Sequence, residues 1–272
     1  MNNRIDQKFK ELRKKKRKAF IAFITAGDPS LKITEELVVA FEKTGVDIVE
    51  LGVPFSDPLA DGPTIQASSL RALHRHVNLF RILDTVKRIR QRSQMPIALM
   101  TYYNPVFHYG EEKFIVQAKQ CGVDGLIIPD LPPEEGGALI KSARAQDMAT
   151  VFFLAPTTTP QRMRYIAQAS SGFIYYVSLT GVTGARRQLS FTIKKQVDMA
   201  RQLTKKPVCV GFGVSTPFQV KAMAQIADGV IVGSAIVNEI EKNRGHKRLV
   251  QNVSRFVARL SAAVSIRMTK GF

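Results

Sequence analysis

Short apolar runs alternate with amphipathic stretches along the whole chain, and the alternation repeats eight times. The runs are rich in β-branched residues and lack a polar residue at every second position, which is typical of parallel strands covered by helices on both faces. The predicted strands are 19–26, 47–54, 96–103, 125–130, 150–156, 172–178, 207–214 and 229–232. The amphipathic stretches predict helices at 2–13, 31–44, 64–75, 79–92, 111–121, 134–147, 160–169, 191–204, 217–226 and 247–264.

Residues at the boundaries agree with this segmentation. Thr159-Pro160 and Thr216-Pro217 each place an N-cap residue before a proline at the first helical position. Gly45, Gly122 and Gly172 lie where a helix must end before the next strand begins.

Eight consecutive βα units predict an α/β fold, a (β/α)8 TIM barrel with an extra N-terminal helix. A doubly wound open sheet is the structural alternative, although such sheets more naturally have about five to seven strands. No linker or low-complexity tract divides the chain, so we expect residues 1–272 to form a single domain. Within it, 1–18 form a basic N-terminal helical segment and 242–272 a basic C-terminal helix.

Composition narrows the class of protein. With 45% hydrophobic and 23% charged residues, the chain has ample apolar content for a large core. Its apolar runs are shorter than the roughly 18 residues that a membrane span needs, and its charged N-terminus does not resemble an export signal. Cys121 and Cys209 form no ligand motif, so we expect a cytoplasmic protein without a metal site.

The net charge of +18 is concentrated at the two ends of the chain. Residues 1–18 contain nine Lys or Arg and two acidic residues, and 242–272 contain eight Lys or Arg and no acidic residue. Such termini can contact phosphate backbones nonspecifically, but no nucleic-acid-binding motif accompanies them. We therefore interpret the basic termini as solvated helix ends. Their charge could serve solubility or bind an acidic partner. We do not expect nucleic acid as a partner.

The stretch 47–64, DIVELGVPFSDPLADGPT, joins a predicted strand to a proline-rich loop and contains two carboxylates of interest. Glu50 lies inside the apolar strand, where an ionised side chain is costly unless a partner or a chemical role compensates. Asp61 lies in the loop. A protonated Glu50 and an ionised Asp61 could divide acid and base roles, whereas a Glu50 satisfied by hydrogen bonds or a lysine is the structural alternative.

Glycines gather at the ends of the last three predicted strands, in the segments 181–184, 211–213 and 233–234. Loops after the last two strands are the usual phosphate site of a barrel, and a short helical turn after Ser234 would direct free N–H groups at an anion. We expect a small phosphorylated ligand. The segment 181–190, with the pair Arg186-Arg187, is either a lid over this ligand or an ordinary surface loop.

The stretch ELGVPFSDPLADGPTIQ (50–66) resembles the most distinctive motif of the tryptophan synthase alpha chain family. Supporting motifs are ITAGDP (24–29), YYNPVF (102–107), GVTGAR (181–186), GFGVS (211–215) and GSAIV (233–237). They occur in the family's order and cover nearly the whole chain. The resemblance implies a (β/α)8 barrel that cleaves indole-3-glycerol phosphate to indole and glyceraldehyde 3-phosphate, with no metal or cofactor of its own.

The resemblance also implies roles for individual residues. Glu50 is expected to shuttle protons, Asp61 to hydrogen-bond the indole N–H, and Tyr175 to be the catalytic tyrosine that precedes GVTG. The residues expected to line the indole pocket are Phe23, Phe212 and either Leu99 or Leu126. Those expected at the phosphate are Gly184, Gly213, Gly233 and Ser234, and Thr183 is the lid residue expected to contact Asp61 on closure.

Members of the family pair with a beta chain that carries pyridoxal phosphate and consumes the indole, so the resemblance implies an alpha2–beta2 assembly. Pro54, Asn104 and Pro132 would lie at the contact, although proline also simply stiffens loops. Two alternatives stay open. One is a stand-alone indole-3-glycerol-phosphate lyase that releases free indole, and the other is a basic nucleic-acid-binding protein built on an inactive barrel.

Overall fold

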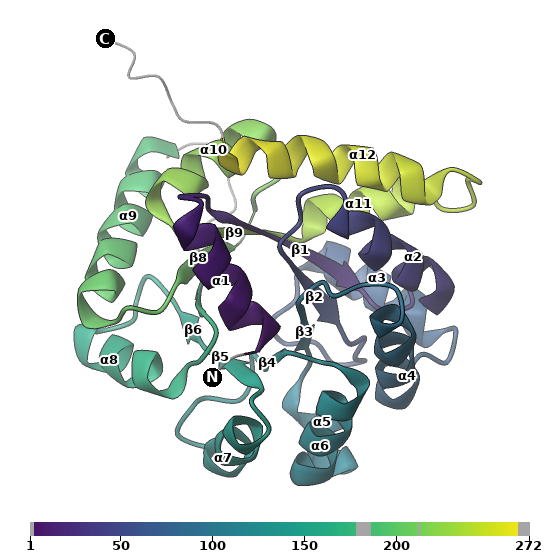
Figure 1. Cartoon of the computed structure of the whole chain (residues 1–272), viewed down its shortest axis with the longest axis horizontal. Coiled ribbons are helices and arrows are strands. Elements are labelled where there is room, and N and C mark those ends of the chain that lie inside the picture. The colour runs from purple at the N-terminus through teal and green to yellow at the C-terminus, as the bar shows by residue number, and fades with distance from the viewer. Residues whose placement is uncertain (1–2, 178–185, 212, 266–272) are drawn as a thin grey trace.

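The computed structural model describes residues 3–177, 186–211 and 213–265, and its elements alternate much as the sequence predicts (Figure 1). The strands are β1 (Ala19–Thr25), β2 (Ile48–Gly52), β3 (Ile97–Met100), β4 (Gly125–Ile127), β5 (Ala149–Val151), β6 (Phe153–Leu154), β7 (Ile174–Val177), β8 (Val208–Gly211) and β9 (Gly229–Val232). The helices are α1 (Arg4–Lys14), α2 (Leu31–Glu42), α3 (Pro63–Leu73), α4 (Leu79–Arg90), α5 (Tyr103–Tyr109), α6 (Glu111–Cys121), α7 (Gly137–Ala145), α8 (Pro160–Ala169), α9 (Arg186–Leu203), α10 (Pro217–Ile226), α11 (Ser234–Lys242) and α12 (Leu249–Ala262), followed by the short 3-10 helix η1 (Ala263–Ser265).

The strands are parallel and form one sheet that closes into a barrel. β1 pairs with both β2 and β9, so the first and last strands of the chain are neighbours. The strand order is β5-β4-β3-β2-β1-β9-β8-β7-β6, and its two ends are separated in sequence only by Phe152. The Phe152 carbonyl accepts a hydrogen bond from the Tyr175 N–H at 3.0 Å. This bond continues the backbone pairing with β7 across the break between β5 and β6. The predicted barrel is confirmed, with its fifth strand in two pieces.

Three connections carry an additional helix between a strand and the helix that covers it: α3 after β2, α5 after β3 and α11 after β9. The pattern predicts α3 and a helical turn at α11, but it does not predict α5. The strand expected at 96–103 ends at Met100, and α5 begins at Tyr103, whose N–H donates to the Asp130 carboxylate at 2.9 Å. Asn104, expected in a loop, therefore lies on a helix.

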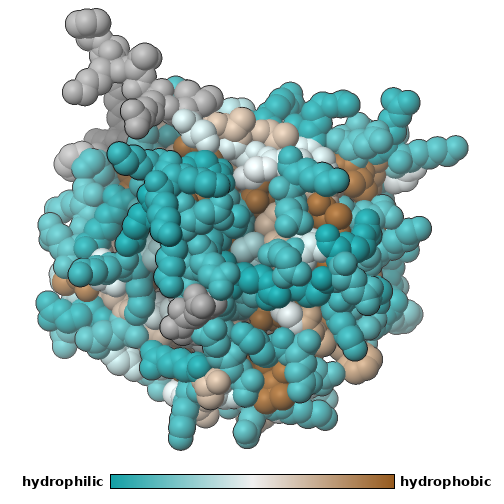
Figure 2. All heavy atoms as spheres, in the orientation of Figure 1, coloured by the Kyte–Doolittle hydropathy of each residue, from teal (hydrophilic) through white to brown (hydrophobic). Residues whose placement is uncertain are grey.

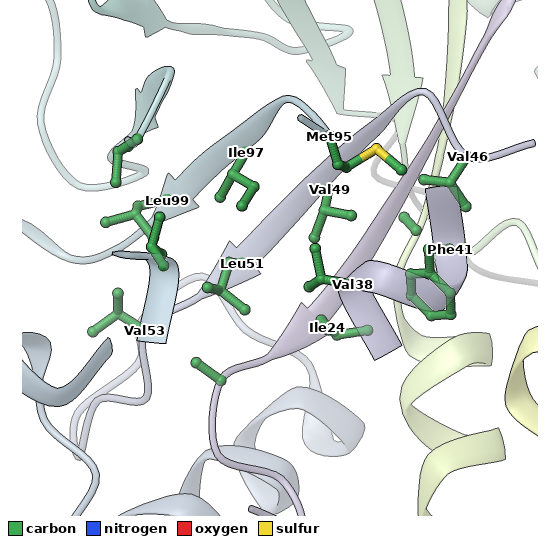
Figure 3. Close-up of a cluster of buried hydrophobic side chains, with 14 of the residues drawn as sticks. Ile24, Val38, Phe41, Val46, Val49, Leu51, Val53, Met95, Ile97 and Leu99 are labelled. Carbon is green, nitrogen blue, oxygen red and sulfur yellow. The ribbon is translucent and has the colours of Figure 1, made fainter. Parts of the chain in front are cut away.

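Alternate strand residues divide the core into two layers. The outward layer packs between strands and helices, and its members in Figure 3 include Val38, Phe41, Val49, Leu51, Val53, Ile97 and Leu99. The inward layer fills the barrel, and its members include Ala19, Ile21, Ile48, Ala98, Ile127, Ala149 and Cys209. This alternation decides which side chains can reach the barrel interior.

Helix α1 covers the end of the barrel at which the strands begin, and it crosses in front of them in Figure 1. Its buried residues Ile5, Phe9 and Leu12 belong to the same cluster as the inward side chains of the strands. Asn3 caps the helix by accepting the Asp6 N–H at 3.1 Å, and its amide group donates to the Asp124 carbonyl at 3.0 Å. The extra N-terminal helix is confirmed, and it forms the floor of the barrel.

Three aspartates at this floor each precede a strand and hold the start of another strand. Their carboxylates accept backbone N–H groups as follows: Asp47 from Phe20 at 2.9 Å, Asp124 from Ile97 at 2.9 Å and Asp228 from Val208 at 3.1 Å. Cations of the N-terminal segment pair with all three, namely Arg17 with Asp47, Arg4 with Asp124 at 2.9 Å and Lys18 with Asp228 at 3.3 Å. Part of the basic charge at the N-terminus therefore stabilises the barrel. This role differs from the two expected for the basic termini, which were solubility and an acidic partner.

The outer surface around α1 is hydrophilic in the view of Figure 2. Exposed lysines there include Lys10, Lys14 and Lys16 of the N-terminal segment and Lys205 before β8. Within the described ranges, no helix is long and apolar enough to cross a membrane. The same part of the chain holds no group of three His, Cys, Asp or Glu side chains placed to bind a metal ion.

Candidate active site

Glu50 is directed into the barrel by the alternation of β2. Its neighbours Val49 and Leu51 lie in the outward apolar layer (Figure 3), so the side chain between them points toward the barrel axis. In register, Glu50 lies beside Phe23 of β1 and Ala98 of β3. The residue has no solvent exposure.

Burial without a partner sets the charge state of Glu50. Among the residues that the structure describes, neither carboxylate oxygen has a hydrogen-bond partner, so the alternative of a carboxylate satisfied by hydrogen bonds or a lysine is not observed. Loss of hydration raises the pKa of Glu50 from 4.5 to about 8, because a dry environment disfavours the ionised form. At pH 7 the protonated form then outnumbers the ionised form by about tenfold. Such a carboxyl can begin a reaction as a proton donor.

Tyr175 of β7 lies on the opposite side of the barrel from β2 and points into the same interior. Its ring contacts that of Phe153 with a centroid distance of 4.9 Å, and a Cβ added to Gly211 would lie 2.5 Å from its hydroxyl. Burial raises the pKa of Tyr175 well above 10, and the charge of Glu50 raises it further. The adjacent Tyr176 belongs to the outward layer, which favours Tyr175 as the tyrosine of the site.

Asp61 ends the loop after β2 and directly precedes Gly62, the N-cap of α3. It lines a pocket with Phe23, Met100 and Tyr102, and this pocket has a volume of only about 10 Å³. That volume suits roughly one water molecule, so a larger ligand requires the pocket to widen. Burial raises the pKa of Asp61, although a hydrogen bond from the Tyr102 hydroxyl lowers it, so the environment is less polar than the sequence suggests.

Tyr102 is a site residue that the sequence pattern does not single out. Its hydroxyl donates to the Asp61 carboxylate and accepts the Ala60 N–H at 2.9 Å, and its ring stacks on Phe55 with a centroid distance of 5.2 Å. Burial raises the pKa of Tyr102 to about 12, so the hydroxyl stays protonated as a donor. Its place just after the strand next to the carboxylate strand is the signal that could have identified it.

The apolar wall of the pocket agrees with the expectation in part. Phe23 lies over β2, where a Cβ added to Gly52 would be 2.6 Å from its ring, and it also lies close to Gly233. Either Leu99 or Leu126 was expected in this wall, but both belong to the outward layer (Figure 3 shows Leu99). Met100, one residue later on β3, faces the pocket instead.

The start of α11 lies next to this wall. Gly233 is the N-cap of α11 and Ser234 is its first residue, so the free N–H groups of the first turn and the positive end of the helix dipole are available to an anion. Gly213, after β8, has a φ of 67°, and a Cβ added there would meet no atom of the described residues within 4 Å. This open, glycine-bearing corner can admit a phosphate.

Three of the expected ligand-binding residues, Thr183, Gly184 and Phe212, lie outside the described residues. The segment 181–190 was expected to be a lid or a loop, but its second half, from Arg186, is the start of α9. The glycine-bearing part of the segment also lies outside the described residues.

Comparisons with known proteins decide the family. The model of the tryptophan synthase alpha chain family matches residues 9–265. A tryptophan synthase alpha chain from Geotalea daltonii is 50% identical over 262 residues, which cover 96% of this chain and 99% of the relative. The chain belongs to the tryptophan synthase alpha chain family.

Solved structures agree with this assignment. Tryptophan synthase subunit alpha from Legionella pneumophila str. Paris superimposes with a TM-score of 0.90 at 36% identity, covering 97% of this chain and 99% of that chain. A chain of Mycobacterium tuberculosis tryptophan synthase gives a TM-score of 0.89 at 34% identity, covering 98% and 100%. As a tryptophan synthase alpha chain, the protein is a lyase that catalyses the aldol cleavage of indole-3-glycerol phosphate. A nucleic-acid-binding protein on an inactive barrel is not favoured.

The strand-end face of the tryptophan synthase alpha chain differs from expectation at the residues proposed for a partner. Asn104 is exposed and Pro132 is half-buried, but Pro54 is buried within the chain itself. Two large apolar side chains on the same face are strongly exposed instead: Leu59 at 90%, in the loop after β2, and Phe107 at 69%, on α5. Isolated positions in a motif do not reveal such exposure, because it depends on how the loop and α5 fold.

Proposed function

We propose that Glu50, Asp61 and Tyr175 carry out the cleavage of indole-3-glycerol phosphate in this chain. Breaking the bond between indole C3 and the glycerol side chain requires a proton at C3 and the removal of the proton from the hydroxyl that becomes the aldehyde. The ring N–H gives up its proton as C3 is protonated and regains it as the bond breaks, so indole leaves with its N–H restored. In this scheme Glu50 begins protonated and gives its proton to C3. Its carboxylate can then take the proton of the side-chain hydroxyl, which returns the acid to its starting state.

The observation that carries this proposal is the unpartnered, fully buried carboxyl of Glu50 on the inward face of β2. No structural hydrogen bond within the described residues accounts for an acid at that position, and burial keeps it in the protonated form that the first step needs. Asp61, in the adjoining pocket, would accept the indole N–H. Tyr175, across the interior, would contact the substrate between these two acids.

The two ends of the substrate would be held by different elements. The indole ring would lie against Phe23, and the phosphate would bind the backbone N–H groups at Gly213, Gly233 and Ser234. Thr183, Gly184 and Phe212 would complete this site. Binding energy from the phosphate would then position the scissile bond against Glu50.

We further propose that the chain is a single domain that assembles with a tryptophan synthase beta chain as an alpha2–beta2 complex. The exposed Leu59 and Phe107, beside Asn104 and Pro132 on the strand-end face, support a partner on that side. Pyridoxal phosphate would belong to the beta chain, and this chain would use no cofactor. A stand-alone lyase that releases indole would need the same active site, but the family assignment does not favour it.

The test measures indole release from indole-3-glycerol phosphate by the full chain, with and without a beta chain. Glu50→Gln is expected to abolish nearly all turnover while substrate still binds, and Asp57→Asn, on the exposed part of the same loop, is the matched control. If Glu50→Gln keeps more than about a tenth of the wild-type rate, Glu50 is not the proton shuttle. Full activity of the isolated chain, with no co-elution with a beta chain in gel filtration, would instead identify the stand-alone lyase.

A further inference from the structure

Three polar side chains from three segments meet beside the end of β1. Arg71, near the C-terminal end of α3, donates to both carboxylate oxygens of Asp28, from Nε at 2.9 Å and from Nη2 at 2.7 Å. Its remaining terminal nitrogen, Nη1, donates to Glu241 of α11 at 2.9 Å. One guanidinium group therefore joins the loop after β1 to two different helices.

The two arms of this cluster differ in burial. The side chain of Asp28 is 2% exposed and that of Arg71 is 16% exposed, so the bidentate pair between them is largely shielded from water and has a fixed geometry. The side chain of Glu241 is 47% exposed. The Asp28 arm thus anchors Arg71, and the Glu241 arm can be removed without leaving a buried charge unpaired.

The two helices joined by Arg71 are two of the three additional helices that begin at the active face. α3 begins directly after Asp61, and α11 begins with Ser234 at the phosphate corner. The helices pack against each other and both pack on β1 (Figure 1 shows their positions). Their first residues therefore belong to opposite ends of the substrate site, while their last turns are tied together by Arg71.

We propose that Arg71 is a positioning residue that sets the spacing between Asp61 and the phosphate-binding start of α11. This inference rests on the proposed roles of Asp61 and Ser234. We call Arg71 with its partners Asp28 and Glu241 the clamp. From Arg71 back to Gly62, helix α3 spans about 13 Å, so a tilt of α3 by about 5° about the clamp moves Asp61 by about 1 Å. A displacement of that size can cost about 100-fold in rate. Arg71 thereby affects catalysis without touching the substrate.

Two substitutions separate the arms of the clamp. Glu241→Ala removes the tie to α11 and keeps the Arg71–Asp28 pair, whereas Arg71→Lys keeps a charge beside Asp28 but cannot bridge both carboxylates in the same geometry. Glu35→Ala is the control away from the active face, because Glu35 of α2 also accepts from arginines outside its own helix, Arg88 of α4 at 3.3 Å and Arg92 at 3.0 Å. The bridge to Arg88 lies between the covering helices α2 and α4.

The experiment measures kcat and KM for indole-3-glycerol phosphate and the inhibition constant of inorganic phosphate, using the full chain. Glu241→Ala is expected to raise KM and the phosphate inhibition constant about fivefold, with kcat within about twofold of wild type. Arg71→Lys is expected to lower kcat at least about tenfold as well, because Asp61 is displaced. A purely structural role would lower the melting temperature without this division between KM and kcat.

Unchanged KM and phosphate inhibition in Glu241→Ala would overturn the inference, and so would equal changes in Glu35→Ala. Parallel assays of Glu50→Gln and Asp61→Asn distinguish this failure from a failure of the proposed site. If those two variants lose turnover while Glu241→Ala keeps the wild-type KM and phosphate inhibition and Arg71→Lys keeps the wild-type kcat, only the positioning role is wrong. If Glu50→Gln and Asp61→Asn keep their turnover, the proposed site is wrong and the positioning role falls with it.

Discussion

Replacing Glu50 with glutamine removes a buried acid whose protonation is linked to folding. In the unfolded chain this carboxyl has its ordinary pKa of 4.5, whereas burial raises the pKa to about 8 in the folded chain. Between pH 4.5 and pH 8 the unfolded state therefore releases this proton while the folded state keeps it. The free energy of unfolding must fall as the pH rises through that window, and the loss is complete above about pH 8.

The magnitude follows from the two pKa values. A difference of about 3.5 pKa units corresponds to about 5 kcal/mol of stability, since one unit is worth about 1.36 kcal/mol. Roughly two thirds to three quarters of this loss falls between pH 5 and pH 8. Glutamine has nearly the same shape and does not titrate, so the Glu50→Gln variant lacks this part of the pH dependence.

The assay is a series of urea denaturation curves at pH 5, 6, 7 and 8, from which the free energy of unfolding is obtained for each protein. The free energy of unfolding of Glu50→Gln is expected to rise by about 3 to 4 kcal/mol relative to that of wild type across the series. Asp57→Asn, an exposed carboxylate in the loop after β2, should follow the wild-type curve. If wild type and Glu50→Gln show the same pH dependence, the Glu50 carboxyl is not protonated at neutral pH, and its role as the starting acid is refuted.

Three further substitutions test other parts of the structure. Tyr102→Phe removes the hydrogen bond that lowers the pKa of Asp61, so the acidic limb of the profile of kcat/KM against pH should move to higher pH. An unmoved acidic limb would contradict the hydrogen bond between Tyr102 and Asp61. Ile5→Ala, at the barrel floor, should cost about 2 to 5 kcal/mol in urea denaturation with kcat unchanged, whereas a loss below about 1 kcal/mol would mean that α1 is not part of the core. Gly211→Ala places a methyl group 2.5 Å from the Tyr175 hydroxyl and should reduce indole release at least about tenfold; near-normal release would show that Tyr175 can shift freely.

Local patterns predict the barrel well because each strand and most helices carry their own signals. Thr159 and Thr216 cap α8 and α10 where the sequence predicts, each before a proline at the first helical position. The unpredicted α5 lacks a local cap, since the carboxylate at its first N–H comes from Asp130, 27 residues away. The interruption of the fifth strand at Phe152 is likewise set by its pairing with β7.

The sequence likewise predicts some residues of the site and misses others. Glu50 is conspicuous in sequence because it is a charged residue within an apolar run, and its inward direction follows from the alternation of its neighbours. The choice between Leu99 and Met100 as the pocket residue depends instead on the register of β3 against β2, which the sequence alone does not provide. Tyr102 becomes part of the site only through the fold of the loop that carries Asp61.

The floor helix α1 also sets an order of events in folding. It is synthesised first, yet Arg13 donates to the carbonyl of Lys205 at 3.2 Å, and Lys18 pairs with Asp228 across 210 positions of the chain. During synthesis these contacts cannot form until the residues of β8 and β9 are present, so we expect α1 to complete its docking late. If it docks after the rate-limiting step, substitutions at these contacts should speed unfolding and leave the refolding rate unchanged.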